Sequence, residues 1–244
     1  MQVSLIDFNG KGTADENWYA ARILAFSKNT RLQMTPDGLD KFMHMPVDEL
    51  QKELTYMSAT IASSWELVSL TFAINGISRA VAQQITRTRT ASYAMQSQRV
   101  TNMSDVAFDV PPTLPSELHE HYQSAFHTAK QNYNELVKGG AALEDARGVL
   151  PINVHCNLIA KYNLRAWVDV VRARDSLRVQ SEYRDIVAAM KREVLAVWPW
   201  AQSFIEPKTA KAVALIEEVA GKLTNQEQRT ALAKAADLLK KETA

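Results

Sequence analysis

Residues 66–76 read ELVSLTFAING, and this stretch decides the fold class. Its apolar side chains recur at every second position from Val68 to Ile74. A period of two is typical of a β-strand with one buried face, and Asn75-Gly76 supplies turn residues at its end. Most of the remaining apolar periodicity in the chain is helical. The pattern therefore predicts an α/β (α+β) fold.

Further elements are predicted on both sides of this strand. Before it, we expect a strand over 2–8, a helix over 17–28, a loop over 34–40 and a helix over 47–61. After it, we expect a helix over 77–87, an extended segment over 91–100, a break at the prolines of 111–115, and helices over 116–138, 152–174, 179–198, 208–221 and 225–242. The chain, 1–244, is expected to form one domain. Residues 207–244 are predicted to be a C-terminal helical extension that packs on the body or on a partner subunit.

Composition excludes several classes of protein. The chain has 244 residues, is 46% hydrophobic and carries a formal net charge of only +1, which argues against a general nucleic-acid binder. A single cysteine rules out an internal disulfide and fits a reducing compartment. The first residues lack the pattern of a secretory signal, and no apolar run approaches the ~20 residues that span a membrane. We therefore expect a cytoplasmic protein without nucleic-acid or membrane partners.

Common catalytic and metal-binding motifs are missing from the sequence. It contains no His-Glu-x-x-His, no Cys-x-x-Cys and no glycine-rich phosphate loop, so no protein-bound metal is expected. Cys156 falls in a largely apolar segment with no adjacent arginine or lysine. Both a catalytic thiol and an inert buried cysteine are considered, and the second is favoured.

The clearest functional signal lies in residues 84–99, which read QITRTRTASYAMQSQR. Three arginines stand among hydroxyl and amide side chains, and no acidic residue occurs in the stretch. A solvated helix face would usually interleave acidic residues with its arginines. The planar guanidinium group suits phosphate, and neutral polar side chains suit the rest of a polar ligand. The stretch predicts a site for a phosphorylated small molecule.

Two later segments add further arginines. Arg147 precedes a glycine and a proline, so a simple helix cap and a ligand contact both remain open. In the expected helix over 152–174, Asp169 is spaced to pair with Arg165 or Arg172, whereas Arg174 has no acidic neighbour at helical spacing. Arg174 is therefore the better candidate for ligand binding. Gln180 and Glu182 lie close to further arginines and are expected to anchor the pair of helices.

Together, these segments resemble the flavin-dependent thymidylate synthases. The family pattern Arg-His-Arg, seven residues, Ser, is similar to Arg87-Thr88-Arg89 followed by Ser97 and Arg99, with Gln84 upstream. Residues 144–151 are similar to the family's Glu-x-Ala-Arg-x-x-Leu-Pro. The family's Asn-x-Arg … Leu-Arg helix is matched by residues 163–174, and 180–182 fall at its Ala-Gln-Trp-Glu. The motifs stand in the same order over roughly residues 60–185.

The resemblance implies a homotetrameric enzyme with a central, mostly antiparallel sheet flanked by helices and a helical C-terminal half. It implies FAD as cofactor and NADPH and methylenetetrahydrofolate as co-substrates, with reductive methylation of dUMP at C5. The implied nucleotide-binding residues are Gln84, Arg87, Ser97, Arg99, Arg147 and Arg174, of which Arg174 and Ser97 are the implied catalytic residues. The implied FAD-binding residues are Ser63, Glu66, Arg87, Thr88, Arg89, Asn163, Arg165 and Asp169.

The sequence departs from the family pattern at several positions. Thr88 replaces the motif histidine, Ala94 and Met95 replace an Asn-Glu pair, Asp169 stands for Asn and Ser181 for Trp. These changes leave the arginines in place but alter the surroundings of flavin and base. Alternatives to dTMP synthesis are therefore a pyrimidine nucleotide C5-hydroxymethylase, an enzyme acting on dCMP, or a non-catalytic nucleotide-binding relative. An unrelated arginine-rich helical binding protein is a further alternative.

Overall fold

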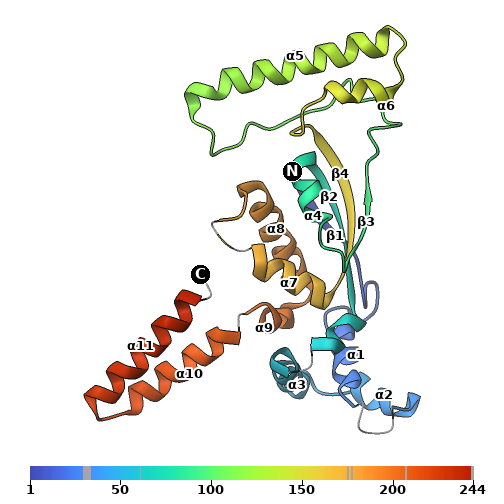
Figure 1. Ribbon diagram of the computed structural model, residues 1–244. Coiled ribbons are helices and arrows are strands. Elements are labelled where there is room, and N and C mark those ends of the chain that lie inside the picture. The colour runs from blue at the N-terminus through green and yellow to red at the C-terminus, as the bar shows by residue number, and fades with distance from the viewer. Residues whose placement is uncertain (30–33, 61, 175, 177, 207, 243–244) are drawn as a thin grey trace.

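The computed structural model describes residues 1–244 except 30–33, 61, 175, 177, 207 and 243–244. Its centre is a four-stranded antiparallel sheet in the order β1-β2-β4-β3. Figure 1 shows α4 and α8 beside this sheet and the long α5 lying across one end. The expected α+β class is confirmed. The strands are β1 (Gln2–Phe8), β2 (Ser69–Ser78), β3 (Ser92–Met95) and β4 (His155–Asn163).

Alternation of side chains builds the main core on one face of the sheet. On β2, Leu70, Phe72 and Ile74 are fully buried, as the sequence predicts. Phe72 stands opposite Ala160 of β4, which in turn stands opposite Tyr93 of β3. The core continues into α7 (Leu164–Arg174) and α8 (Ser181–Val197), whose large side chains are buried against the sheet. This packing fixes α8 relative to the strands.

The helix expected over 152–174 is wrong in its first half. Residues 155–163 form β4, and only residues from Leu164 onward are helical. Cys156, Leu158, Ala160 and Tyr162 are buried, while the side chains between them are exposed. The apolar Ile159 on the exposed face blurs this period of two in the sequence. Pairing with β2 and β3 on either side, a non-local interaction, decides the conformation.

The loop expected over 34–40 is also wrong, because α2 (Pro36–Met43) occupies most of it. The Thr35 side chain accepts a hydrogen bond from the Gly38 amide, and Pro36 is in the first turn. Proline is preorganised for that position, and threonine is a favourable N-cap. The Pro-Asp-Gly sequence therefore begins a helix here instead of forming a turn.

Most other boundaries agree with expectation within a few residues. The helices are α1 (Tyr19–Ser27), α3 (Val47–Thr60) and α4 (Arg79–Ile85); Ile61, expected to end the helix over 47–61, lies outside the described residues. The strand expected over 66–76 is preceded by the short 3-10 helix η1 (Ala62–Leu67) and extends to Ser78. Gly76 has a φ of +64°, and the register shifts there, so Asn75-Gly76 makes a bulge and does not end the strand.

Residues 96–154 form an arm at one end of the sheet. It carries η2 (Ser116–Leu118), α5 (His119–Lys138), α6 (Leu143–Ala146) and η3 (Arg147–Val149). A small core of its own contains Met103, Tyr133 and Ala146. The arm joins the sheet through a bridge between Phe108 and Val154 and through the His155 amide, which donates to the Ala107 carbonyl at 2.9 Å. The arm is thus held mainly at its base (Figure 1).

Apart from β4, the C-terminal half is mainly helical, as expected. After α8 come η4 (Pro199–Ala201), α9 (Gln202–Ile205), α10 (Lys208–Lys222) and α11 (Gln226–Glu242). Figure 1 shows α10 and α11 as a helical pair that projects away from the sheet. Assignment of this pair as an extension of a single domain stays a prediction. Within the described residues, no helix has the length and apolar character required to cross a membrane.

Candidate functional site

The tight turn between α4 and β3 carries Arg87 and Arg89. The Tyr93 hydroxyl lies 2.9 Å from the Ile85 carbonyl oxygen and 3.0 Å from that of Thr88, and it donates to this pair. Tyr93 is half-buried on β3, so the turn is held to the sheet. Burial raises the pKa of Tyr93, so the hydroxyl keeps its proton for this contact. The sequence analysis assigned no role to Tyr93.

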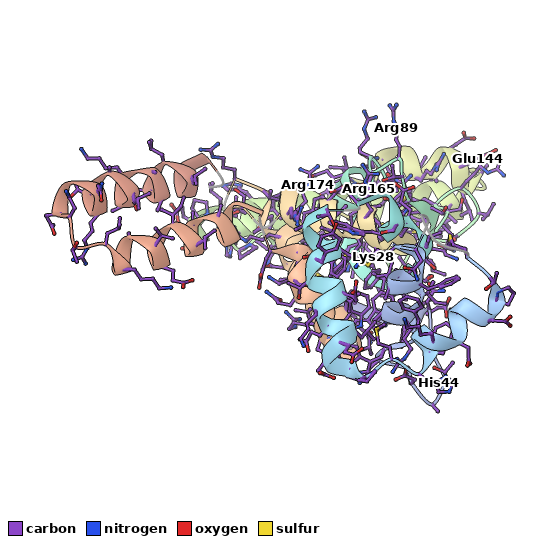
Figure 2. All side chains as sticks on the ribbon, turned by 90° about the horizontal axis from the view of Figure 1, so that it is seen from below. Lys28, His44, Arg89, Glu144, Arg165 and Arg174 are labelled. Carbon is purple, nitrogen blue, oxygen red and sulfur yellow. The ribbon has the colours of Figure 1, made fainter. Side chains whose placement is uncertain are left out.

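Arg87 and Arg89 are exposed, and neither forms an ion pair with a carboxylate of the described residues. Figure 2 shows Arg89 projecting outward, on the same side of the molecule as Arg165 and Arg174. Other arginines do have acidic partners: Arg165 lies 2.7 Å from Glu66, for example. The positive charge of this turn is therefore available to an anionic ligand.

The first turn of α8, residues 180–183, contacts α4, which leads into this turn, and the end of β2. Gln84 donates from Nε2 to Gln180 Oε1 at 2.6 Å. The Glu182 carboxylate accepts from the Ser78 amide and the Ser78 hydroxyl, each at 2.6 Å. The expectation that Gln180 and Glu182 anchor the pair of helices α7 and α8 is therefore corrected. They anchor α8 to the end of β2 and to α4.

Arg174 lies at the end of α7 and is half-buried. Its guanidinium carbon stands 5.1 Å from the centre of the Tyr183 ring, which is the geometry of a cation–π contact. Arg172, expected to pair with Asp169, instead donates to the carbonyls of Phe204 and Glu206 at 2.6 and 2.9 Å. Burial lowers the pKa of Arg172, and nearby Asp169 opposes that change. Arg172 thus has a structural role, whereas Arg174 keeps its polar edge for other contacts.

Tyr183 lies beneath Arg174 and is almost fully buried, with 1% of its surface exposed. Its hydroxyl has no hydrogen-bond partner of normal geometry in the described part of the chain. Burial raises the pKa of Tyr183, while the Arg174 guanidinium and the Thr88 hydroxyl act to lower it. Tyr183 therefore brings Thr88 of the turn and Arg174 of α7 to one place. No sequence motif marked this residue.

The remaining nucleotide-binding candidates lie on the arm. Arg147 donates from Nε to the Glu144 carbonyl at 3.1 Å, and Arg99 Nε lies 3.9 Å from the Glu144 carboxylate. Arg147 was considered both as a helix cap and as a ligand contact. Within one chain, its hydrogen bond is that of a helix cap. Ser97 is exposed, and its hydroxyl accepts from the Arg99 amide at 3.3 Å. Arg99 and Arg147 thus both contact Glu144, and Ser97 contacts Arg99.

The candidate FAD residues gather where β4 leads into α7. Asn163 Oδ1 accepts from the Ala166 amide at 2.8 Å and so caps α7. Arg165 binds Glu66 of η1 at 2.7 Å, so the ion pair expected between Arg165 and Asp169 is replaced by a tertiary one. Ser63 and Asp169 are exposed nearby, on η1 and α7. Ser63, Glu66, Asn163, Arg165 and Asp169 thus share one end of the sheet.

The candidate residues form two separate groups within one chain. Gln84, Arg87, Thr88, Arg89 and Arg174 adjoin the first turn of α8. In contrast, Ser97, Arg99 and Arg147 belong to the arm, whose base meets β4 at His155. Their side-chain hydrogen bonds and ion pairs within the described residues are to one another and to Glu144, and none reaches the turn or α8. Within the described part of one chain, these bonds do not join all the predicted nucleotide-binding residues into one cluster.

The described side chains fit a phosphorylated nucleotide better than a metal. No group of three or more His, Cys, Asp or Glu residues in the described part of the chain could hold a metal ion. Cys156 is buried, and burial raises the pKa of its thiol, which disfavours the nucleophilic thiolate. Unpaired guanidinium groups with neighbouring amides and hydroxyls are the donor set that phosphate and pyrimidine groups require. Arg89 offers the same chemistry, whereas the Arg165 guanidinium already lies 2.7 Å from the Glu66 carboxylate.

The fold and this arrangement define a class: an α+β protein with an arginine-rich site between α4, β3 and α7. The family model described as "Thymidylate synthase complementing protein" matches residues 5–200. A flavin-dependent thymidylate synthase of Sulfurisphaera tokodaii is 30% identical over 183 residues, covering 73% of this chain and 71% of the relative. One of Geobacter sulfurreducens is 33% identical over 169 residues, covering 63% of this chain and 72% of the relative.

The chain belongs to the thymidylate synthase complementing protein family. The resemblance stated from the motifs is therefore confirmed, and so is the expectation of an enzyme of this family. The match ends at residue 200, so α10 and α11 lie beyond it.

Proposed function

We propose that the chain is a flavin-dependent thymidylate synthase that methylates dUMP at C5 with methylenetetrahydrofolate and NADPH. The observation that carries this proposal is the turn beside α8, where Arg87 and Arg89 lack carboxylate partners among the described residues while Gln84 and Arg174 stand next to it. Relatives named flavin-dependent thymidylate synthase support the same activity.

The chemistry of each side chain suggests its role in this reaction. Arg87, Arg99 and Arg147 would bind the nucleotide phosphate, with Ser97 and Gln84 supplying neutral hydrogen bonds. Arg174 would stabilise negative charge that develops on the pyrimidine ring. Bound flavin would supply the redox and one-carbon transfer chemistry. Arg89 and Arg165 would hold the FAD diphosphate, with Thr88, Ser63, Glu66, Asn163 and Asp169 around it.

The separation of the two groups supports a shared site. Because Arg99 and Arg147 make their contacts within the arm and not with the turn or α8, a complete site would take them from a neighbouring copy. A homotetramer, predicted from the resemblance, would supply that copy. A cytoplasmic location likewise stays a prediction.

The visible spectrum of the purified protein is the first test. We expect bound flavin whose absorbance bleaches on addition of NADPH, and conversion of dUMP to dTMP when methylenetetrahydrofolate is present. A colourless protein that still binds dUMP would instead identify a non-catalytic relative.

The mass of the nucleotide product tests the alternatives that arise from Thr88, Ala94 and Met95. Ala94 is exposed on β3 and Met95 is half-buried beside it, and neither side chain carries a carboxylate. A product heavier than dTMP by one oxygen would identify the hydroxymethylase. Turnover of dCMP in place of dUMP would identify the altered base.

A further inference from the structure

Tyr183 joins the two elements that carry the proposed nucleotide-binding residues. It projects from the first turn of α8, with the Arg174 guanidinium stacked 5.1 Å from its ring centre. Arg174 is the last residue of α7, where a helix end would otherwise leave a long side chain free to change rotamer. A buried aromatic face restricts the guanidinium plane and leaves its N–H groups for a ligand.

The ring of Tyr183 is itself held rigidly. The side chain is buried in the main core, and α8 is tied down next to it by the bonds from Glu182 to Ser78. Gln180, three residues earlier, accepts from Gln84. The same short turn thus contacts Gln84 and Arg174, which approach from different elements.

The hydroxyl of Tyr183 does not explain its presence. It is buried and lacks a hydrogen-bond partner of normal geometry among the described residues. A buried polar atom without a partner destabilises a fold. Phenylalanine would fill the same space without that penalty. The contact that Tyr183 demonstrably makes at the site is the one between its ring and Arg174.

We propose that Tyr183 is a positioning residue whose ring holds the Arg174 guanidinium in the orientation that binds the nucleotide. The proposal rests on the proposed function, because it assigns Arg174 to that nucleotide. It goes further because Tyr183 lies outside the arginine motifs, yet it determines how tightly Arg174 binds the nucleotide. The aromatic ring of Tyr183 orients Arg174, and the Tyr183 hydroxyl is not required for nucleotide binding.

Two substitutions at Tyr183 distinguish the contribution of its ring to dUMP binding from that of its hydroxyl. Tyr183→Leu removes the aromatic face, and we expect the Kd for dUMP to rise about tenfold, which corresponds to ~1.4 kcal/mol. Tyr183→Phe keeps the face, and we expect it to bind dUMP within about twofold of the wild type. Isothermal titration calorimetry measures both, and FAD affinity should stay unchanged in each.

A second cation–π pair provides a matched control. Lys28 Nζ lies 4.7 Å from the centre of the Tyr56 ring; Lys28 is the residue after α1, and Tyr56 is on α3. Tyr56→Leu removes this pair and should leave dUMP affinity unchanged. If Tyr183→Leu does not fold, Tyr183→Met replaces it, because methionine fills irregular core space without an aromatic face. Urea unfolding of each variant reports its stability.

The outcomes distinguish the two proposals. A wild-type chain that does not bind dUMP overturns both the proposed function and the role of Tyr183. If the wild type binds dUMP and Tyr183→Leu or Tyr183→Met binds it equally well, only the positioning role is overturned. Equal weakening by Tyr183→Phe and Tyr183→Leu would assign the effect to the hydroxyl and also overturn it. A parallel loss of FAD affinity would show a general structural role instead.

Discussion

The turn beside α8 and the arm both carry predicted nucleotide-binding arginines, yet the fold treats them differently. Next to α8, the Arg174 guanidinium lies over the buried Tyr183 ring, and Gln84 is hydrogen-bonded to Gln180. Arg87 forms no ion pair with a carboxylate of the described residues. On the arm, Arg99 and Arg147 both turn toward Glu144. One region is organised within the chain. The arginines of the arm make only local contacts, as expected of residues that complete a binding site on another copy of the chain.

The largest effect is expected when each region loses an arginine. Arg174→Ala and Arg147→Ala should each raise the Kd for dUMP about 10- to 100-fold, since a charge-assisted hydrogen bond contributes ~1.5–3 kcal/mol. Arg229→Ala, an exposed arginine of α11, should bind like the wild type. Isothermal titration calorimetry gives the three constants.

Mixing the Arg174→Ala and Arg147→Ala variants tests whether the two regions meet across copies. If Arg147 and Arg174 of one site come from different chains, co-expressed variants regain about a quarter of wild-type sites by random assembly. Turnover of dUMP by the mixture measures the recovery. A mixture no more active than either variant alone would show that both arginines act from the same chain.

Glu182→Ala should have the next largest effect, because it removes both bonds to Ser78. We expect a loss of ~2 kcal/mol in the free energy of unfolding and weaker dUMP binding. Glu193 is a matched control on the same helix: its carboxylate accepts from the Leu5 amide at 3.2 Å, away from the turn. Glu193→Ala should reduce stability in urea but leave dUMP affinity intact. If Glu182→Ala and Glu193→Ala lose dUMP affinity equally, the first turn of α8 has no specific role in nucleotide binding.

Alkaline pH should weaken the region beside α8 to a smaller extent. Burial raises the pKa values of Tyr93, Tyr162 and Tyr183 above the ordinary 10.0. The folded state therefore holds these protons more tightly than the unfolded state, and their contribution to stability is full below about pH 10 and is lost as pH rises further. The urea midpoint should fall between about pH 9 and about pH 11.

Phenylalanine at Tyr162 or Tyr183 should flatten that pH dependence. A midpoint that is independent of pH over this range would contradict the assignment.

The smallest effect is expected at Cys156, on β4 at the base of the arm. Its thiol is buried with a raised pKa, so it is a poor nucleophile. Cys156→Ala should cost ~1 kcal/mol in unfolding free energy and change turnover of dUMP less than about twofold. A loss of turnover without a loss of folding would restore the catalytic thiol considered from the sequence.

Local patterns in the sequence were sufficient for much of the fold. The alternation from Val68 to Ile74 predicted β2, and the long periodic segments predicted α5, α8, α10 and α11. β4 was missed because its pairing with β2 and β3 is non-local, and Ile159 disguises its alternation. α2 was missed although Thr35-Pro36 is a recognisable helix start.

The sequence by itself determined the family and the identity of the arginines, because spacing along the chain and the absence of acidic neighbours are one-dimensional properties. Only the tertiary structure decided which of them stand together. Gln84 meets Gln180, and Arg174 meets Tyr183, across loops that no spacing rule connects. The physical reason is packing: the core that buries α8 against the sheet selects these partners, and it leaves Arg99 and Arg147 on an arm beyond the end of β4.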